Sequence, residues 1–292
     1  MQSRFRTVLR YAGRAALGLV VLIVVAAGIV AWVGGRRVAG PYESPPHAIA
    51  VPTDSAAVAE GGRLAAFWGC TGCHGRDAGG RVFFETPLGD RLVAPNLTRV
   101  VRELDATELE RAVRHGIGPD GASLFGMPAG MFSKISDGDL GKVIAYLRSV
   151  RPTADSLPAT RHSLMFRLFA LMEPRALSAA QVDAAASHPP GPDSLAPSST
   201  HRDTLALGQY LAVTGCPECH GPDLKGSENG PPDLRIAAAY SPAQFDRLVE
   251  EGVLLTGPSD GLMSEIATGR IGKLTRAERG ALHAYLRTLA RE

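Results

Sequence analysis

Cysteine is scarce in this sequence, with four among 292 residues, and none is left over for a wider disulfide framework. Aromatic residues are also sparse, at 6% of the chain. The formal net charge is only +2, and six of the basic residues lie within the first 37 positions. The rest of the chain holds 25 basic and 29 acidic residues. Nucleic-acid-binding domains carry clustered basic surface, so we expect no nucleic-acid partner.

Acidic residues are absent from the first 37 positions, and every charge is absent from residues 15–33. This run of 19 residues exceeds the apolar region of a signal peptide, about 7–15 residues. At about 1.5 Å per residue it nearly crosses a hydrocarbon core about 30 Å thick. Four Arg before it and two after it orient the amino terminus toward the cytoplasm. We predict a cytoplasmic tail at 1–14 and an uncleaved anchor at 15–33, with a removed signal peptide as the alternative.

The four cysteines form one motif twice, Cys-x-x-Cys-His, with members Cys70, Cys73 and His74 and members Cys216, Cys219 and His220. This is the attachment motif of haem c. Two thiols three positions apart on a tight turn can each bond one vinyl group of the same porphyrin. The adjacent His can supply a nitrogen ligand to the iron. The sequence therefore predicts two covalently attached haem c groups in an exported protein.

Three other interpretations of the cysteines are weaker. A zinc site needs a second pair of ligands, whereas here His follows the second Cys both times and no further Cys remains. A thioredoxin-like redox pair belongs beside a βαβ pattern, which the sequence does not show. A structural disulfide across two intervening residues is strained and closes a trivially small loop.

The chain repeats itself, and the two motifs align with an offset of 146 residues. Gly62 to Gly69 aligns with Gly208 to Gly215, and an Ala-Tyr-Leu-Arg segment occurs near the end of each half. Apolar periodicity predicts closing helices over about 136–150 and 275–289. The pairs Asp105/Glu108 and Thr275/Glu278 read as capping boxes, and Ser241-Pro242 as a helix start. Only 80–92 could hold a small hairpin, so the predicted class is mainly α.

Residues 151–200 differ from both halves because they are rich in Pro and Ser, which is typical of a linker. They separate two predicted domains at 54–150 and 201–292. Within the linker, Ser163 to Met172 is apolar but too short to span a membrane. We expect it to pack against the two domains rather than to lie on a lipid surface.

With these features in view, the chain resembles the diheme members of the class I cytochrome c family. The resemblance covers about residues 54–150 and 201–290. It rests on the two haem motifs and both Tyr-Leu-Arg helices, together with the segments Ala94-Pro95-Asn96-Leu97-Thr98, Gly126-Met127-Pro128 and Pro231-Pro232-Asp233-Leu234. It implies two tandem class I cytochrome c-like domains after an N-terminal transmembrane helix.

The resemblance also implies the remaining site residues. The proximal ligands would be His74 and His220, and the distal ligands Met127 and Met263. Met131 is the competing candidate in the first half and is expected to be a packing residue. The carbonyls of Pro95 and Pro232 would accept the second N–H of each proximal His. Pro95 departs from the family spacing, because the first half inserts residues 79–93.

These features favour an electron carrier on the periplasmic face of the inner membrane, a single-pass protein and not an enzyme. Its expected partners are redox proteins, either a membrane oxidoreductase of the respiratory chain or an exported dehydrogenase. Two alternatives stay open. A dihaem peroxidase would need one iron with an open position, and a haem–copper oxidase subunit with two cytochrome domains would usually have a shorter linker.

Overall fold

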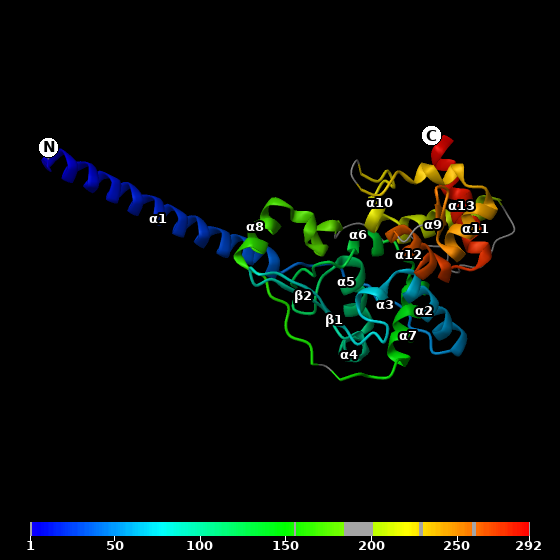
Figure 1. Ribbon diagram of the computed structural model, residues 1–292. Helices are drawn as coiled ribbons and strands as arrows, with labels where there is room; N and C mark the ends of the chain where they lie inside the picture. Colours follow the sequence, from blue (N-terminus) through cyan, green and yellow to red (C-terminus); the bar gives the residue numbers. More distant parts are fainter. Residues whose placement is uncertain (1, 155, 184–200, 228–229, 259–260, 292) are drawn as a thin grey trace.

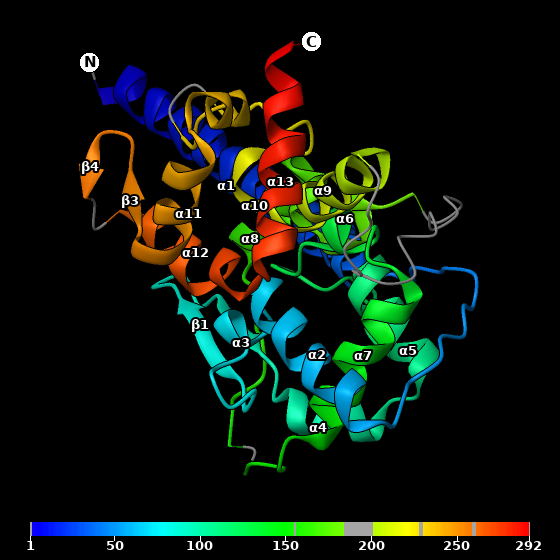
Figure 2. The same cartoon turned by 90° about the vertical axis from the view of Figure 1, so that its right-hand side faces the viewer.

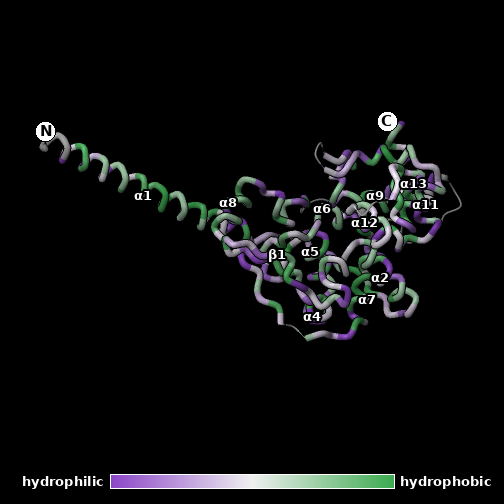
Figure 3. The backbone as a smooth tube through the Cα atoms, viewed as in Figure 1, coloured by the Kyte–Doolittle hydropathy of each residue, from purple (hydrophilic) through white to green (hydrophobic). Residues whose placement is uncertain are grey.

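The computed structural model describes residues 2–154, 156–183, 201–227, 230–258 and 261–291. A long helix, α1 (Gln2–Ala39), projects from a mainly helical body, and apolar residues line much of its length (Figures 1 and 3). In the described residues it is the one helix long and apolar enough to cross a membrane. It extends beyond the predicted span of residues 15–33 in both directions.

The first half of the body combines helices with one small antiparallel hairpin. Its elements are α2 (Ser55–Phe67), α3 (Cys70–Cys73), β1 (Arg81–Glu85), β2 (Arg91–Ala94), α4 (Leu97–Glu103), α5 (Ala106–His115), α6 (Ala129–Phe132) and α7 (Asp137–Ser149). In the hairpin, Arg81 pairs with Ala94 and Glu85 with Arg91, with a bulge between Val82 and Phe84. The hairpin lies where the sequence predicted one.

The second half repeats this order with a smaller hairpin placed later. Its elements are α9 (His201–Gly215), α10 (Pro217–His220), η3 (Leu234–Ala239), α11 (Pro242–Glu251), β3 (Val253–Leu254), β4 (Gly257–Pro258), α12 (Leu262–Gly269), η4 (Ile271–Lys273), α13 (Arg276–Thr288) and η5 (Leu289–Arg291). The predicted mainly α class is therefore confirmed. Figure 2 shows the β3–β4 hairpin at the edge of this half.

The helix starts follow from side chains that satisfy the first free backbone N–H groups. Asp105, Ser241 and Thr275 each form a capping box with the residue three positions on. The side chain of Ser136 caps α7 without a reciprocal bond from the residue three positions on. The predicted capping boxes and the two closing helices are confirmed to within a residue or two of their expected ends.

In each half, the first helix crosses the closing helix so tightly that only glycine fits. A Cβ on Gly61 would lie 1.9 Å from the carbonyl oxygen of Lys142, and a Cβ on Gly208 would lie 2.0 Å from that of Ala281. Gly61 and Gly208 are 147 positions apart, whereas the haem motifs are 146 apart. Helices α2 and α9 therefore correspond at an offset of 147 residues, one more than the offset of the haem motifs. Each residue of α2 is thus equivalent to a residue of α9 one position later than the motif alignment gives.

The predicted linker contains ordered elements: α8 (Leu164–Met172), η1 (Pro174–Ala176) and η2 (Ser178–Gln181). Its last part, residues 184–200, lies outside the described residues. Buried Phe166, Ala170 and Leu177 form a small cluster with Phe125 of the first half and Val38 of α1. The packing of this segment thus involves α1, which the sequence did not suggest, as well as the first half.

The two halves share one apolar core rather than two separate ones. A single cluster of buried residues includes Leu64 and Phe67 of the first half and Leu207, Leu211 and Leu282 of the second. Polar contacts also join the halves, among them the ion pair between Arg63 on α2 and Glu278 on α13. The cytochrome-like halves therefore pack as one body.

Candidate functional site

The first motif follows a sharp break in the chain at the end of α2. Gly69 has φ +77°, a left-handed conformation that suits glycine. A Cβ there would lie 3.2 Å from the guanidinium carbon of Arg270. The next turn is α3, which brings Cys70 and Cys73 onto one short helical segment and places His74 directly after it. The chain thus presents two thiols and one imidazole from a single tight turn.

His74 is 9% exposed, and its Nδ1 lies 2.9 Å from the carbonyl oxygen of Pro95. A carbonyl only accepts hydrogen bonds, so Nδ1 carries the proton and Nε2 is left as a neutral donor for a metal. The β1–β2 hairpin explains the long separation of 21 positions. It leaves after Gly80 and returns at Ala94, so the inserted residues project away and Pro95 still reaches the imidazole.

The second motif has the same geometry without a hairpin. Nδ1 of His220 lies 2.7 Å from the carbonyl oxygen of Pro232, which leaves Nε2 of this histidine unprotonated and available to a metal, as at His74. The loops that follow the two histidines also correspond. Ala78 and Leu224, which are 146 positions apart, are the described non-glycine residues with positive φ, at +57° and +62°.

No disulfide joins any of the four cysteines. Burial raises the pKa of Cys70 to about 11 and that of Cys216 to about 12. Burial raises the pKa of Cys73 and Cys219 as well. The guanidinium of Arg270 acts on all four thiols in the opposite direction, so the two motifs lie around one cation.

Arg270 joins the two motifs directly, and sequence reasoning did not find it. Its Nε donates to the carbonyl oxygen of Phe67, 3.0 Å away, just before the first motif. Its Nη1 donates to Glu218, which lies inside the second motif, at 2.9 Å. A Cβ on Gly215 would lie 2.7 Å from the Phe67 ring, which shows how closely the two segments approach. Nothing in the local sequence pattern marks Arg270, because its partners are distant in the chain.

The candidate distal ligands lie on the segments that precede the closing helices. Met127 and Met263 are partly buried and pack against the core cluster that also contacts Cys70 and Cys216. Met131, on α6, is 3% exposed and is a full member of that core. This burial supports the expected packing role of Met131, and the ligand roles of Met127 and Met263 stay predictions.

Three histidines outside the haem motifs each contact other side chains. His115 ends α5 and is 3% exposed, beside the carboxylate of Glu110. His162 stacks on Phe166 with ring centroids 4.2 Å apart. His283 stacks on Phe245 at 4.5 Å. Within the described residues, no three His, Cys, Asp or Glu side chains converge to hold a metal ion.

The residues at each motif fit a haem c group. Each motif supplies two sulfur atoms for thioether bonds and one imidazole nitrogen oriented by a carbonyl. The indole N–H of Trp68, two residues before Cys70, is buried without a hydrogen-bond partner among the residues the structure describes. Such an unmatched donor is suited to a carboxylate of the kind that a haem carries. The donor set is therefore the one that the motif predicts.

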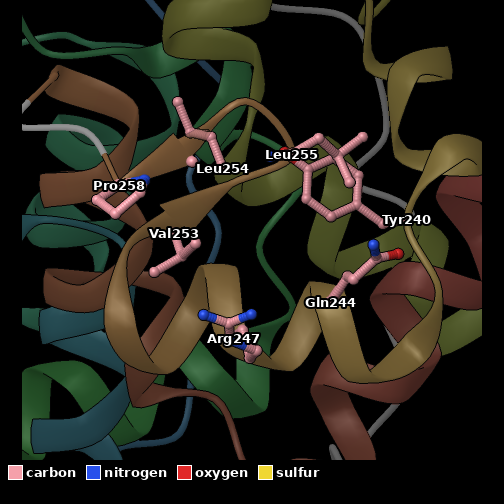
Figure 4. Close-up of a pocket in the computed structure, with 8 residues that line it drawn as sticks. Tyr240, Gln244, Arg247, Val253, Leu254, Leu255 and Pro258 are labelled. Carbon is pink, nitrogen blue, oxygen red and sulfur yellow. The ribbon is translucent and has the colours of Figure 1, made fainter.

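A shallow pocket on the second half is separate from these residues. It lies between α11 and the β3–β4 hairpin, with Tyr240, Gln244 and Arg247 on one side (Figure 4). The hydroxyl of Tyr240 accepts a hydrogen bond from the backbone N–H of Leu255 across it. None of the residues that line the pocket belongs to a haem motif or to the candidate iron ligands.

Comparison with known families matches both halves. The family described as "Cytochrome C oxidase, cbb3-type, subunit III" matches residues 56–147, and the family described as "Cytochrome c" matches residues 205–290. The chain belongs to the cytochrome c family. Its two cytochrome c domains lie in tandem, each built around one Cys-x-x-Cys-His motif, after an N-terminal apolar helix.

Relatives of this cytochrome c include named subunits of dehydrogenases. It is 30% identical over 187 residues to the "Alcohol dehydrogenase (quinone), cytochrome c subunit" of Gluconacetobacter polyoxogenes, covering 58% of this chain and 36% of that protein. It is 26% identical over 264 residues to the "Fructose dehydrogenase cytochrome subunit" of Gluconobacter japonicus, covering 80% and 52%. It is 27% identical over 276 residues to a nicotinate dehydrogenase subunit from Pseudomonas putida, covering 82% and 22%. The chain thus spans about half or less of the length of these relatives.

Proposed function

We propose that this protein is a membrane-anchored diheme cytochrome c that carries electrons on the periplasmic face of the inner membrane, as the cytochrome subunit or partner of a dehydrogenase. The observation that carries the proposal is the paired geometry of the motifs. In each, the proximal histidine donates Nδ1–H to a proline carbonyl and keeps Nε2 for iron. Arg270 then holds the two motifs beside each other.

Each residue has a defined role in this proposal. Cys70, Cys73, Cys216 and Cys219 would attach two haem c groups covalently, and His74 and His220 would bind their irons. Met127 and Met263 would supply the second protein ligand of each iron, and the carbonyls of Pro95 and Pro232 orient the histidines. A bound haem would supply an iron that gains and loses one electron. Thioether and imidazole ligands together would raise its potential and keep a substrate from the iron.

Several features support a dehydrogenase as the partner. Relatives that align over 264 and 276 residues are named as subunits of dehydrogenases. The match to the cbb3-type oxidase subunit is confined to the first domain. The soluble part is mildly acidic, which favours a partner with a basic docking patch. The proposed domain bounds are 54–150 and 201–292, with α1 as the anchor and its amino terminus in the cytoplasm.

The first experiment is an optical spectrum of the full chain purified from membranes, oxidised and reduced, with and without carbon monoxide. Two low-spin haems per chain and no change with carbon monoxide are expected of an electron carrier. A carbon monoxide adduct on either haem would contradict the proposal and indicate an open iron, as in a dihaem peroxidase.

Covalent attachment and anchoring need separate measurements. The mass of the denatured chain is expected to include two haems, and the double variant Cys70→Ala/Cys73→Ala is expected to retain one. Alkaline carbonate washing is expected to leave the full chain in the membrane pellet. Release into the supernatant, with an N-terminus beyond residue 33, would show that α1 is a removed signal sequence.

A further inference from the structure

The linker helix α8 packs along the last turns of α1. The residues of α1 that it shields recur at helical spacing: Ala27, Val30, Ala31, Gly34, Gly35 and Val38. At Gly34 the approach is so close that a Cβ would lie 2.7 Å from the carbonyl oxygen of Arg167 on α8. Nη1 of Arg167 donates to the carbonyl oxygen of Ala31 at 3.0 Å. The contact is therefore a specific one between two helices (Figure 1).

This contact lies at one end of the apolar run in α1. The run ends at Val33, between the two residues that Arg167 contacts. The shielded stretch from Ala27 to Val38 is about 16 Å long at about 1.5 Å per residue. If α1 crosses a bilayer, α8 is consequently placed across the boundary between hydrocarbon and headgroups, on the side of the cytochrome domains.

Side chains of α1 at this level are typical of such a boundary. Trp32 is 64% exposed, and the guanidinium of Arg36 lies 5.3 Å from the centre of its ring. Arg37 follows directly in the sequence. Trp is enriched where lipid meets water, and Arg there can reach the headgroups. The boundary is thus marked on α1 independently of α8.

The two faces of α8 are both apolar. Phe166 and Ala170 are buried in the cluster with Val38 and Phe125. On the other face, exposed apolar side chains lie on successive turns: Leu164 at 45%, Met165 at 55%, Phe169 at 45% and Met172 at 76%. Arg167 is the one charged residue of the helix. An apolar face of this kind, left in water, is costly and marks a contact surface.

The inserted hairpin of the first domain holds α8 in this position. Asp90 accepts hydrogen bonds from the backbone N–H of Ser163, at 2.6 Å, and from its hydroxyl, at 2.9 Å. Ser163 is the N-cap of α8. Beside Asp90, in the turn between β1 and β2, Leu88 is 64% exposed. The insertion, which the second domain lacks at this place, thus joins the first domain to α8 and exposes one more apolar side chain two residues before that contact.

We propose that the exposed face of α8, together with Leu88, lies in the interfacial layer of the bilayer that α1 crosses, so that α8 packs on the protein with one face and contacts lipid with the other, which the sequence did not favour. This inference rests on the proposed anchor. The lipid surface is favoured over a protein partner because α8 is fixed to α1 at the end of the apolar run, where lipid surrounds any spanning helix. Two attachments at different points, α1 and α8, hold the first domain in one orientation to the membrane, which a single helix followed by residues 40–54 would not do.

The test uses nitroxide labels on single cysteines added to the full haem-loaded chain in phosphatidylcholine vesicles. Labels at Phe169→Cys and Met172→Cys report on α8. Val21→Cys, in the middle of the apolar run, reports on the anchor. Ile236→Cys is the matched control, since Ile236 is 50% exposed on η3 of the second domain. Each label is measured for collision with oxygen, which concentrates in lipid, and with a water-soluble nickel chelate.

The expected result is that both α8 labels favour oxygen over nickel several-fold more than the Ile236 label does, with the Val21 label deeper still. A deep Val21 label with α8 labels freely reached by nickel would overturn the inference and leave the anchor intact. A Val21 label in water would refute the anchor itself. Labels on α8 shielded from both reagents would show that a second copy of the protein covers the face, which also overturns the inference.

Discussion

Tyr210, on the first helix of the second domain, donates a hydrogen bond to Asp139, on the closing helix of the first domain, with 2.9 Å between the oxygens. The first helix of the first domain contacts the closing helix of the second domain in the same way. Arg63, on the first helix of the first domain, forms two bonds of 2.7 Å with Glu278 on the closing helix of the second. Arg63 and Tyr210 occupy equivalent positions on α2 and α9, because these two helices correspond at an offset of 147 residues. The two domains therefore meet through a reciprocal contact.

Replacement of Tyr210 by Phe should destabilise the haem-loaded chain by about 2 kcal/mol. The change leaves a buried carboxylate oxygen of Asp139 and the backbone N–H of Ser136 without this partner. The free energy of unfolding would be measured by guanidinium titration followed by circular dichroism. Tyr146→Phe is the control, since no hydrogen bond of its hydroxyl is found among the described residues, and it should change stability little. Equal losses in the two variants would refute the role of the hydrogen bond.

Replacement of Arg63 by Met should cost more, about 3 kcal/mol, because it leaves the carboxylate of Glu278, 1% exposed, without its cation. Glu278→Gln keeps the capping box with Thr275 and removes the charge, so it should cost less. Arg99→Met is the matched control, since Arg99 pairs with Glu103 at 3.8 Å on the surface. Such an exposed pair contributes about 0–1 kcal/mol. A small effect at Arg63 would show that the interface does not depend on this ion pair.

The two charges between the motifs should shift the haem potentials in opposite directions. Arg270→Gln removes a cation that acts on all four cysteines. Without this positive charge the ferric state of each haem is more stable, so both reduction potentials should fall. Glu218→Gln should raise them. A charge at such range contributes about 1 kcal/mol, which corresponds to some tens of millivolts in a redox titration. Arg279→Gln, which breaks a pair with Glu250 on α11, should have the smaller effect; potentials that ignore Arg270 would contradict the arrangement.

The two methionines of the first domain should separate cleanly by their effects. Met127→Ala is expected to abolish the Met-to-ferric-iron absorption band of one haem and to lower its potential. Met131→Ala should keep the band but destabilise the domain by about 2–5 kcal/mol, because it opens a cavity in the core. Loss of the band in the Met131 variant alone would reverse the assignment.

Acid should release α8 from the hairpin. Burial raises the pKa of Asp90, but the hydrogen bonds from Ser163 and Thr86 outweigh burial and hold this pKa below its usual value. A depressed folded-state pKa stabilises the fold above the unfolded pKa, about 3.9, and that stability is lost as the pH falls through the folded pKa. Hydrogen exchange of α8 amides should therefore accelerate below about pH 4. In Asp90→Asn the faster exchange should already be present at pH 7; slow exchange there would exclude this role of Asp90.

The sequence was sufficient wherever structure depends on local chemistry. The caps at Asp105, Ser241 and Thr275 could be predicted because a capping box needs only neighbours three positions apart. Pro95 and Pro232 could be placed only through a family resemblance. The hairpin that returns Pro95 to His74 shows why the unusual spacing is tolerated.

Contacts between distant segments could not be predicted. Arg270 lies 200 positions from the first motif, and no periodicity links Arg167 to the end of α1. The alignment also did not show that α2 and α9 correspond at 147 residues rather than at the 146 residues of the motifs. Gly61 and Gly62 are adjacent, and either could match Gly208. Only the 1.9 Å approach to Lys142 distinguishes them.

The reciprocal contact between the domains is the arrangement that two identical single-domain chains would form about a twofold axis. In a chain that carries both copies, this association no longer depends on concentration, since the linker keeps each partner permanently available to the other. In a single chain the two contacts also need not be identical, and here an ion pair forms one contact and a hydrogen bond from a phenol forms the other. The two domains thus form an internal pseudo-dimer, whose first half alone uses its β1–β2 hairpin to contact α8 through Asp90 and Ser163.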